Sequence, residues 1–400
     1  GNGGLGRLAS CFLDSIASLG IPGYGYGIRY EFGIFYQKII RGYQVETADN
    51  WLRVGNPWEI TRPRSLFPVK FYGRVETQKN SQGQLENKWV DTQEVMAMAH
   101  DIPIPGYKNN TVNNLRLWSA RSSRELELEL FQAGDYLQSV KNKHESEIIS
   151  KVLYPADRNE LGKELRFKQE YFFISASLSD IIRRYKKQHD NFDQFSEKVA
   201  IQLNDTHPAL AIAELMHVLL DIENIPWEKA WKVTVNTFAF TNHTILPEAM
   251  EKWSLDLFKR VLPRHLDIIF KINQMFMDQV AERYPGDLGK MNRMSIIEEN
   301  HTKYIRMANL SILGSHSTNG VAELHSSILR EKVFPDFHEM FPNRFNNKTN
   351  GVTPRRWLKA CNPELSNLIT DCIGNSWVRD LSKIIKLQDH IEDSQLRKRW

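Results

Sequence analysis

The sequence of 400 residues contains only three cysteines, Cys11, Cys361 and Cys372. A disulfide framework needs more cysteines than this, and an odd number is typical of a reducing compartment, so we expect a cytoplasmic protein. None of the twelve histidines belongs to a His-Glu-x-x-His string or a comparable ligand spacing. We therefore expect no metal site.

The sequence also lacks long apolar runs and a large excess of charge of one sign. No stretch approaches the ~18 apolar residues of a membrane-spanning helix, so we expect no membrane partner. The 52 Lys and Arg residues against 48 Asp and Glu leave a formal net charge of +4. Because nucleic-acid-binding proteins usually carry a clustered basic excess, we expect no nucleic-acid partner. A hydrophobic content of 41% is enough for a large core.

Short apolar strands alternate with helical patterns in the middle of the chain. Val199–Leu203 and Val233–Phe240 are the two expected strands, and their alternation with helices favours a parallel sheet of βαβ units. The other expected elements are a helix over 6–19, a hairpin of 66–77 and 87–101 around a turn at 80–83, and helices over nearly all of 247–327.

Polar clusters follow both expected strands, as Asn204–Pro208 and Thr241–Thr244. Ligands of open α/β sheets bind just beyond the carboxyl ends of the strands. Asp205 and His207 are suited to bind sugar hydroxyls or to orient a proton relay. His243, in the second cluster, is a weaker candidate, because a lone histidine is more often a satisfied core residue.

A second interpretation of the first cluster is structural. Asp205 or Thr206 would then cap a helix that begins near Pro208, since proline is favoured at the first helical position. Capping and ligand binding do not exclude each other, and both interpretations stay open at this point.

The opening string "GNGGLG" runs into the first expected helix. Gly3, Gly4 and Gly6 remove side chains where free helix N–H groups favour an anion, which predicts a phosphate cradle. No Gly-Lys-Ser/Thr follows, and no strand precedes the string, so it is neither a Walker motif nor a convincing dinucleotide fingerprint. A tight turn that requires positive φ explains the glycines equally well.

The loop Asn347–Trp357 carries Arg355 and Arg356 at an expected helix start. These arginines either meet a phosphate or form an ordinary solvated pair at a domain boundary. The residues alone predict an α/β protein with a polar cleft that could bind phosphate. They do not indicate which reaction the protein catalyses.

Several long strings together resemble the glycogen, starch and maltodextrin (α-glucan) phosphorylase family. They match in the family's order and run nearly end to end: "GNGGLGRLASCFLDSIASLGIPGYGYGIRYEFGIF", "GKELRFKQEYF", "VAIQLNDTHPALAI", "TNHTILPEA", "GSHSTNGVAELHS" and "NKTNGVTPRRWLKACNP". The resemblance implies a two-lobed glycosyltransferase-B architecture with pyridoxal phosphate between the lobes. It also implies a hexosyltransferase that cleaves terminal α-1,4-glucosidic bonds with inorganic phosphate to give glucose 1-phosphate.

The resemblance assigns roles residue by residue. His243 hydrogen-bonds the glucose, and its backbone carbonyl faces the developing positive charge, while Asn350 meets another sugar hydroxyl. The remaining assignments are Gly3 and Gly4 to the substrate phosphate, Leu5 to the glucose site, Asp205 and His207 to the glucan channel, and Trp357 to the vicinity of the cofactor. A helix over 135–152 resembles the one that crosses to a partner subunit, which implies a homodimer.

The sequence departs from the family pattern in one loop and in its extent. Asp157 is kept in the loop that gates the active site, but Arg158, Asn159 and Glu160 stand where animal members have an asparagine and two aromatics. The resemblance implies that residues 1–353 form most of the N-terminal lobe, with mainly a Rossmann-like sheet, inserted hairpins and a helical region. Residues 354–400 would begin the cofactor lobe.

No string like the family's cofactor-lysine segment occurs in the sequence. We therefore expect the Schiff-base lysine to lie outside this chain, and we expect residues 1–400 to be inactive alone. The alternatives to a glycogen phosphorylase are a maltodextrin-type phosphorylase and a non-catalytic glucan-binding module.

Overall fold

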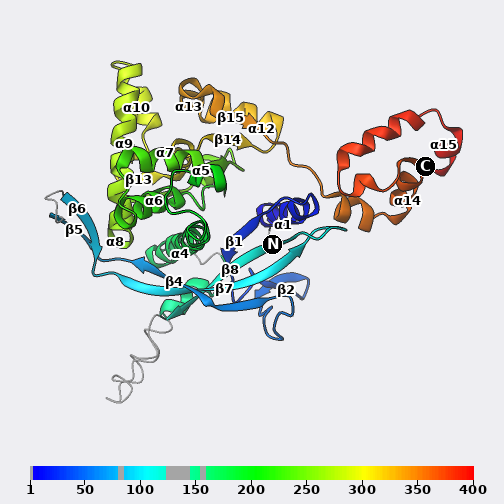
Figure 1. Cartoon of the computed structure of the whole chain (residues 1–400), viewed down its shortest axis with the longest axis horizontal. Helices are drawn as coiled ribbons and strands as arrows, with labels where there is room; N and C mark the ends of the chain where they lie inside the picture. The colour runs from blue at the N-terminus through cyan, green and yellow to red at the C-terminus, as the bar shows by residue number, and fades with distance from the viewer. Residues whose placement is uncertain (1–2, 80–84, 123–144, 154–158) are drawn as a thin grey trace, which may run out of the picture.

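The computed structural model describes residues 3–79, 85–122, 145–153 and 159–400. These residues form a mixed α/β structure in which helices and sheets surround a large buried core (Figure 1). The strands are β1 Tyr24–Ile28, β2 Tyr36–Ile40, β3 Tyr43–Thr47, β4 Ile60–Phe71, β5 Arg74–Lys79, β6 Leu85–Val90, β7 Gln93–Pro105, β8 Val112–Ser122, β9 Ile201–Asn204, β10 Phe238–Thr241, β11 Lys252–Ser254, β12 Ile297–Glu299, β13 Lys303–Arg306, β14 Ser317–Gly320 and β15 Phe345–Asn347. The helices are α1 Gly3–Ser18, α4 Glu160–Tyr185, α5 Phe195–Lys198, α6 Leu210–His217, α7 Trp227–Thr237, α8 Leu255–Val261, α9 Pro263–Arg283, α10 Leu288–Met294, α11 Met307–Leu313, α12 Glu323–Ile328, α13 Pro335–Met340, α14 Pro363–Ile373 and α15 Ser394–Arg399.

The predicted parallel sheet is present. Its four strands are ordered β15-β14-β10-β9, and every neighbouring pair is parallel. Strand β9, which comes first along the chain, covers Ile201–Asn204 and lies close to the predicted strand Val199–Leu203. Because all four strands point the same way, the residues that follow them gather at one edge.

The second strand is shorter than predicted. Strand β10 begins only at Phe238, because helix α7 continues through Thr237. The β-branched residues near Val233 favour a strand. However, the buried positions of α7 recur every three or four residues, as expected of a helix that packs one face on the core; they are Trp227, Ala230, Val233, Thr234 and Thr237.

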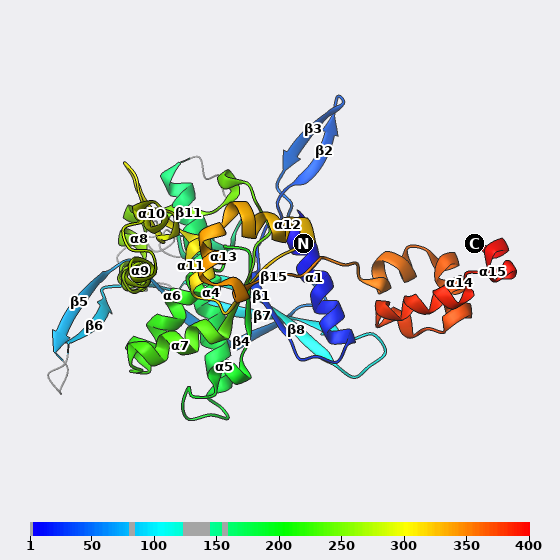
Figure 2. The same cartoon turned by 90° about the horizontal axis from the view of Figure 1, so that it is seen from above.

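A second sheet, ordered β1-β8-β7-β4, lies on the other side of helix α4 from the parallel sheet (Figure 1). The fully buried indole of Trp118 on β8 donates to Ser177 Oγ on α4 at 2.9 Å. The expected hairpin strands are confirmed as the antiparallel pairs β4–β7 and β5–β6. Two hairpins, β2–β3 and β5–β6, project from the body (Figure 2).

The prediction that residues 247–327 are nearly all helical is wrong in part. Strands β11, β12 and β13 form a small antiparallel sheet, and β14 belongs to the parallel sheet. These strands have three or four residues each. Runs this short show no alternation of polar and apolar residues that a sequence pattern can detect.

The last part of the chain has its own small hydrophobic cluster, formed by Ile369, Trp377 and Val378. Arg355 fastens it to α1, because its guanidinium donates to Asp14 Oδ2 at 2.8 Å and to the carbonyl of Val378 at 2.8 Å. Figures 1 and 2 both show this segment beyond α1, away from the main body.

Three predictions concern residues outside those that the structure describes. They are the gate residue Asp157, the turn at 80–83 and most of the helix over 135–152. Within the described part of the chain, no helix has the length and apolar character needed to cross a membrane.

Candidate functional site

Asparagines mark the carboxyl edge of the parallel sheet. Asn204 and Asn347 end β9 and β15, Asn319 is the penultimate residue of β14, and Asn242 directly follows β10. Amide side chains both donate and accept hydrogen bonds. This edge therefore carries both donors and acceptors, with Asn204 and Asn347 half-buried and Asn242 and Asn319 buried beneath them.

The two predicted polar clusters lie side by side at this edge. His243 Nε2 lies 2.7 Å from Asn204 Oδ1, and the backbone N–H of Asp205 donates to the carbonyl of Thr241 at 2.9 Å. Since an amide oxygen only accepts, Nε2 carries the proton and Nδ1 keeps its lone pair. Burial lowers the pKa of His243, although the charge of Asp205 opposes this shift, so the imidazole is neutral near pH 7.

Asp205 does not cap the following helix. Helix α6 begins at Leu210 with Ala209 at its N-cap and no side-chain cap, whereas Asp205 Oδ1 accepts from the adjacent backbone N–H of Thr206 at 2.7 Å. Thr206 does not cap the helix either, since its hydroxyl donates to Glu251 Oε2 at 3.3 Å, so the capping interpretation is wrong. Asp205 also has φ 68°, an unusual left-handed conformation for a residue with a side chain, and such strain clusters at functional sites.

His325 is a member of this group that sequence reasoning missed. Its Nδ1 accepts from the backbone N–H of Val321 at 3.0 Å, and the N–H of Asn350 donates to the carbonyl of Val321 at 3.0 Å. Burial lowers the pKa of His325, while Asp205 acts in the opposite direction. His207 and His325 both lower the pKa of His243 through their charge, so these histidines lie within electrostatic range of His243 at this edge.

A sequence signal for this group existed. Each strand of the parallel sheet ends at or beside an asparagine, and "STNG" marks the third strand. Strand β14 lies within the range 247–327 that was predicted to be helical. The sequence therefore did not place His325 after a strand end.

Gly3, Gly4 and Gly6 lie in the first turns of helix α1, which begins at Gly3 rather than Gly6. A right-handed helix requires no positive φ, so the tight-turn explanation fails for Gly3, Gly4 and Gly6. A Cβ atom on Gly4 would meet nothing within 4 Å, and packing does not demand glycine there either. The first N–H groups of a helix have no partner within the helix, which is the feature that favours an anion.

The other predicted residues are not joined to this group by any contact that the described ranges contain. Leu5 is half-buried on α1, and Trp357 is 51% exposed. Arg355 does not form a solvated pair with Arg356, because it is engaged with Asp14 and Ser15. Thr353 Oγ1 also donates to Asp14 at 3.2 Å, which links the Asn350 loop to helix α1.

Among the described residues, one cluster elsewhere has ligand atoms close enough to hold a metal ion. Atoms of Glu214, His217 and His265 lie within 4.8 Å of one another. Glu214 also accepts from Tyr171 at 2.9 Å and Ser175 at 2.7 Å. Both carboxylate oxygens are thus already satisfied by protein donors, and the cluster is explained as a buried hydrogen-bond network.

A family model described as carbohydrate phosphorylase matches residues 1–400. The chain belongs to the carbohydrate phosphorylase family. Among similar curated proteins, the muscle form of glycogen phosphorylase from Oryctolagus cuniculus is 56% identical over 98% of this chain and 47% of the relative. The liver form from Homo sapiens is 56% identical and the brain form from Rattus norvegicus 55%, each over 98% of this chain and 47% of the relative.

This phosphorylase chain therefore spans about half the length of the curated relatives it matches. The family membership agrees with the resemblance stated above, and the mixed α/β fold agrees with an N-terminal phosphorylase region. The polar edge of the parallel sheet is the candidate site for sugar binding.

Proposed function

We propose that the gene product containing this chain is a glycogen phosphorylase that cleaves terminal α-1,4-glucosidic bonds with inorganic phosphate. The observation that carries the proposal is the meeting of Asp205, His243 and the Asn350 loop at one edge of the parallel sheet, in a chain of the phosphorylase family. In the proposed enzyme, this edge binds the terminal glucose of an α-1,4-glucan.

Each side chain of the site has a defined task in this proposal. The neutral imidazole of His243 is held by Asn204 and offers Nδ1 as an acceptor for a glucose hydroxyl. The exposed amide of Asn350 binds a second hydroxyl. The carbonyl oxygen of His243 faces the sugar carbon, where it favours the positive charge that develops as the glucosidic bond breaks.

The phosphate has a proposed binding site at helix α1. Gly3 and Gly4 stand in the first turn of α1, and a helix N-terminus offers N–H groups without partners in the helix and a partial positive charge. The open space beside Gly4 lets an anion approach the backbone. Asp205 and His207 follow β9 and are proposed to line the glucan channel with hydrogen-bonding groups.

Pyridoxal phosphate is the cofactor proposed for the gene product. The indole of Trp357, 51% exposed, fits a role beside a flat aromatic ring. When bound, the cofactor supplies a phosphate group that exchanges a proton with the substrate phosphate. Its lysine is proposed to lie outside residues 1–400.

A two-lobed glycosyltransferase-B architecture is the proposed context of the site. The separate cluster of Ile369, Trp377 and Val378 supports a domain boundary near Pro354, with a second lobe beginning there. A homodimer through the helix over 135–152 is part of the same proposal.

The test is the formation of glucose 1-phosphate from glycogen and inorganic phosphate by the gene product with cofactor. We expect turnover, and we expect His243→Ala to lower kcat by about 100-fold or more, because one preorganised polar contact in a transition state is worth this much. The exposed His316 provides the control, His316→Ala, which should leave kcat unchanged.

The same assay separates the alternatives. Higher turnover on maltoheptaose than on glycogen would identify a maltodextrin-type enzyme, and glucan binding without any turnover would identify a binding module. Residues 1–400 purified alone should give no product.

A further inference from the structure

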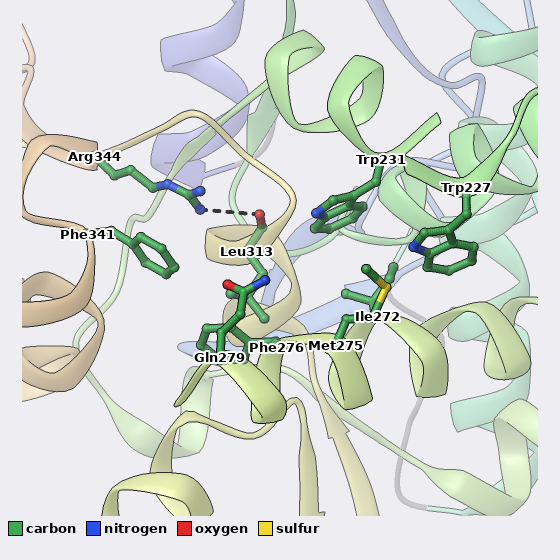
Figure 3. Close-up of a pocket in the computed structure, with 9 residues that line it drawn as sticks. All are labelled: Trp227, Trp231, Ile272, Met275, Phe276, Gln279, Leu313, Phe341 and Arg344. Carbon is green, nitrogen blue, oxygen red and sulfur yellow. Dashed lines mark hydrogen bonds between the residues drawn. The ribbon is translucent and has the colours of Figure 1, made fainter. Parts of the chain in front are cut away.

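A small cavity lies on the other side of the parallel sheet from the candidate site. It has a volume of ≈ 60 Å³ and is lined by residues of α7, α9 and α11 and by Phe341 and Arg344 (Figure 3). Leu313 and Arg344 precede strands β14 and β15, whereas the candidate site residues follow the strands. The cavity therefore lies at the amino ends of the parallel strands, and the candidate site lies at their carboxyl ends.

The polar groups of this cavity are mainly hydrogen-bond donors. Arg344 contributes a guanidinium group, and Trp227 and Trp231 contribute indole N–H groups, which cannot accept. Figure 3 shows both indole nitrogens on the side of their rings that faces Arg344. Among the described residues that line the cavity, Gln279 is the only side chain with an acceptor oxygen, and none carries a carboxylate.

Two of these donors lack a full set of partners within the described residues. Trp227 is 9% exposed, and its Nε1 has no hydrogen-bond partner. Arg344 donates through Nη1 to the carbonyls of Ile312 at 3.1 Å and Leu313 at 3.3 Å. Its guanidinium lies over the ring of Phe341, 4.1 Å from the centroid, but no carboxylate pairs with it in the described part of the chain.

The charge of Arg344 is costly without a counter-ion. Burial lowers the pKa of Arg344, yet an arginine stays protonated in proteins. Lys271 adds to the positive potential, because its ammonium lies 4.1 Å from the ring centroid of Trp227. An anion that enters the cavity would satisfy these groups together.

We propose that this donor-lined pocket binds a small organic carboxylate. The guanidinium of Arg344 matches the two oxygens of a carboxylate, and the indole N–H groups supply further donors. The rings of Phe276, Phe341 and Trp231 offer apolar walls to a short hydrocarbon body. A volume of ≈ 60 Å³ holds about four water-sized groups, which suits a carboxylate with a few carbons and is too small for a glucan.

Titration of the gene product with butyrate, followed by tryptophan fluorescence and ligand-observed NMR, tests the proposal. We expect saturable binding in the millimolar range, at least tenfold weaker binding of the neutral isostere butyramide, and weaker binding of inorganic phosphate. Arg344→Gln should weaken butyrate binding at least tenfold. The control is Arg283→Gln. Arg283 is exposed at the end of α9, one of the helices that line the cavity, and this change should leave butyrate binding unchanged.

A second variant keeps the test decisive if Arg344→Gln fails to fold. Trp231→Phe preserves an aromatic wall and removes one N–H donor, and it should weaken butyrate binding severalfold. The proposal is overturned if butyrate shows no saturable binding, if butyramide or phosphate binds equally well, or if a folded Arg344→Gln or Trp231→Phe variant binds butyrate as the unmodified protein does.

Discussion

His243 Nε2 lies 2.7 Å from Asn204 Oδ1, so the loop after β10 is joined to the last residue of β9. This hydrogen bond orients the imidazole and determines which nitrogen carries the proton. It turns two neighbouring strand ends into one polar surface.

Asn204→Ala removes this orientation. We expect kcat for phosphorolysis by the gene product to fall about 10- to 100-fold with a smaller change in KM, since small displacements of a positioned group have effects of this size. Gln202→Ala is the matched control, because Gln202 lies on the same strand and its side chain is also hydrogen-bonded across to the chain of β10, donating to Thr241 Oγ1 at 2.8 Å. Equal kcat values for Asn204→Ala and the unmodified enzyme would contradict the orienting role.

Glu170→Gln should alter how stability depends on pH. Burial and the neighbouring Glu251 hold the pKa of Glu170 well above its usual range. The folded state therefore keeps a proton that the unfolded state loses, so stability is complete below the unfolded pKa of about 4.5 and decreases as the pH rises through the folded pKa.

A glutamine at position 170 does not titrate, so the variant does not lose stability as the pH rises. Between pH 5 and 8, the free energy of unfolding of Glu170→Gln should lack a slope of up to about 1.4 kcal/mol per pH unit that the unmodified protein shows over part of this range. Urea unfolding at several pH values measures it, with the exposed Glu248→Gln as the control. Identical slopes in all three proteins would show that Glu170 is ionised when folded.

Glu214→Ala should destabilise the core. Glu214 accepts from Tyr171, Ser175 and His265, the last at 2.6 Å, and its two histidine neighbours hold the pKa of Glu214 below its usual range despite burial. Removing the carboxylate leaves several buried polar groups without partners, so we expect a loss of about 3–5 kcal/mol in the free energy of unfolding. Glu197→Ala, on the surface of α5, should change it by less than about 0.5 kcal/mol.

Arg355→Ala should release the C-terminal segment from helix α1. The change removes the hydrogen bonds of Arg355 to Asp14, Ser15 and the carbonyl of Val378, which leaves the linker near 348–354 with fewer attachments. Chymotryptic cleavage between residues 348 and 358 should become severalfold faster. Arg356→Ala, at the exposed neighbouring position, is the control. Equal cleavage rates in the two variants would show that Arg355 does not hold the C-terminal segment against α1.

The positions of the main helices and of the strand that ends in Asn204 follow from local patterns. The 3.6-residue period of α1 and the short apolar run before Asn204 are properties of contiguous residues, so they are visible without a structure. The same is true of the polar residues that follow the strands, because Asp205 and His243 were identified from their place in the alternation of strands and helices.

The contacts that make a site were decided by the tertiary structure. Helix α7 extended into the predicted second strand because its buried face packs on the core. The strand before His325 has four residues and becomes a strand only through pairing with β10 and β15.

The sequence by itself determined which polar groups the chain carries to the ends of its strands. Only the fold decided that Asn204 bonds His243, that Asp205 binds the next backbone N–H instead of capping α6, and that half-buried Arg344 has no carboxylate partner among the described residues. These outcomes depend on which segments, distant along the chain, come to lie within hydrogen-bonding distance, and local pattern does not contain that information.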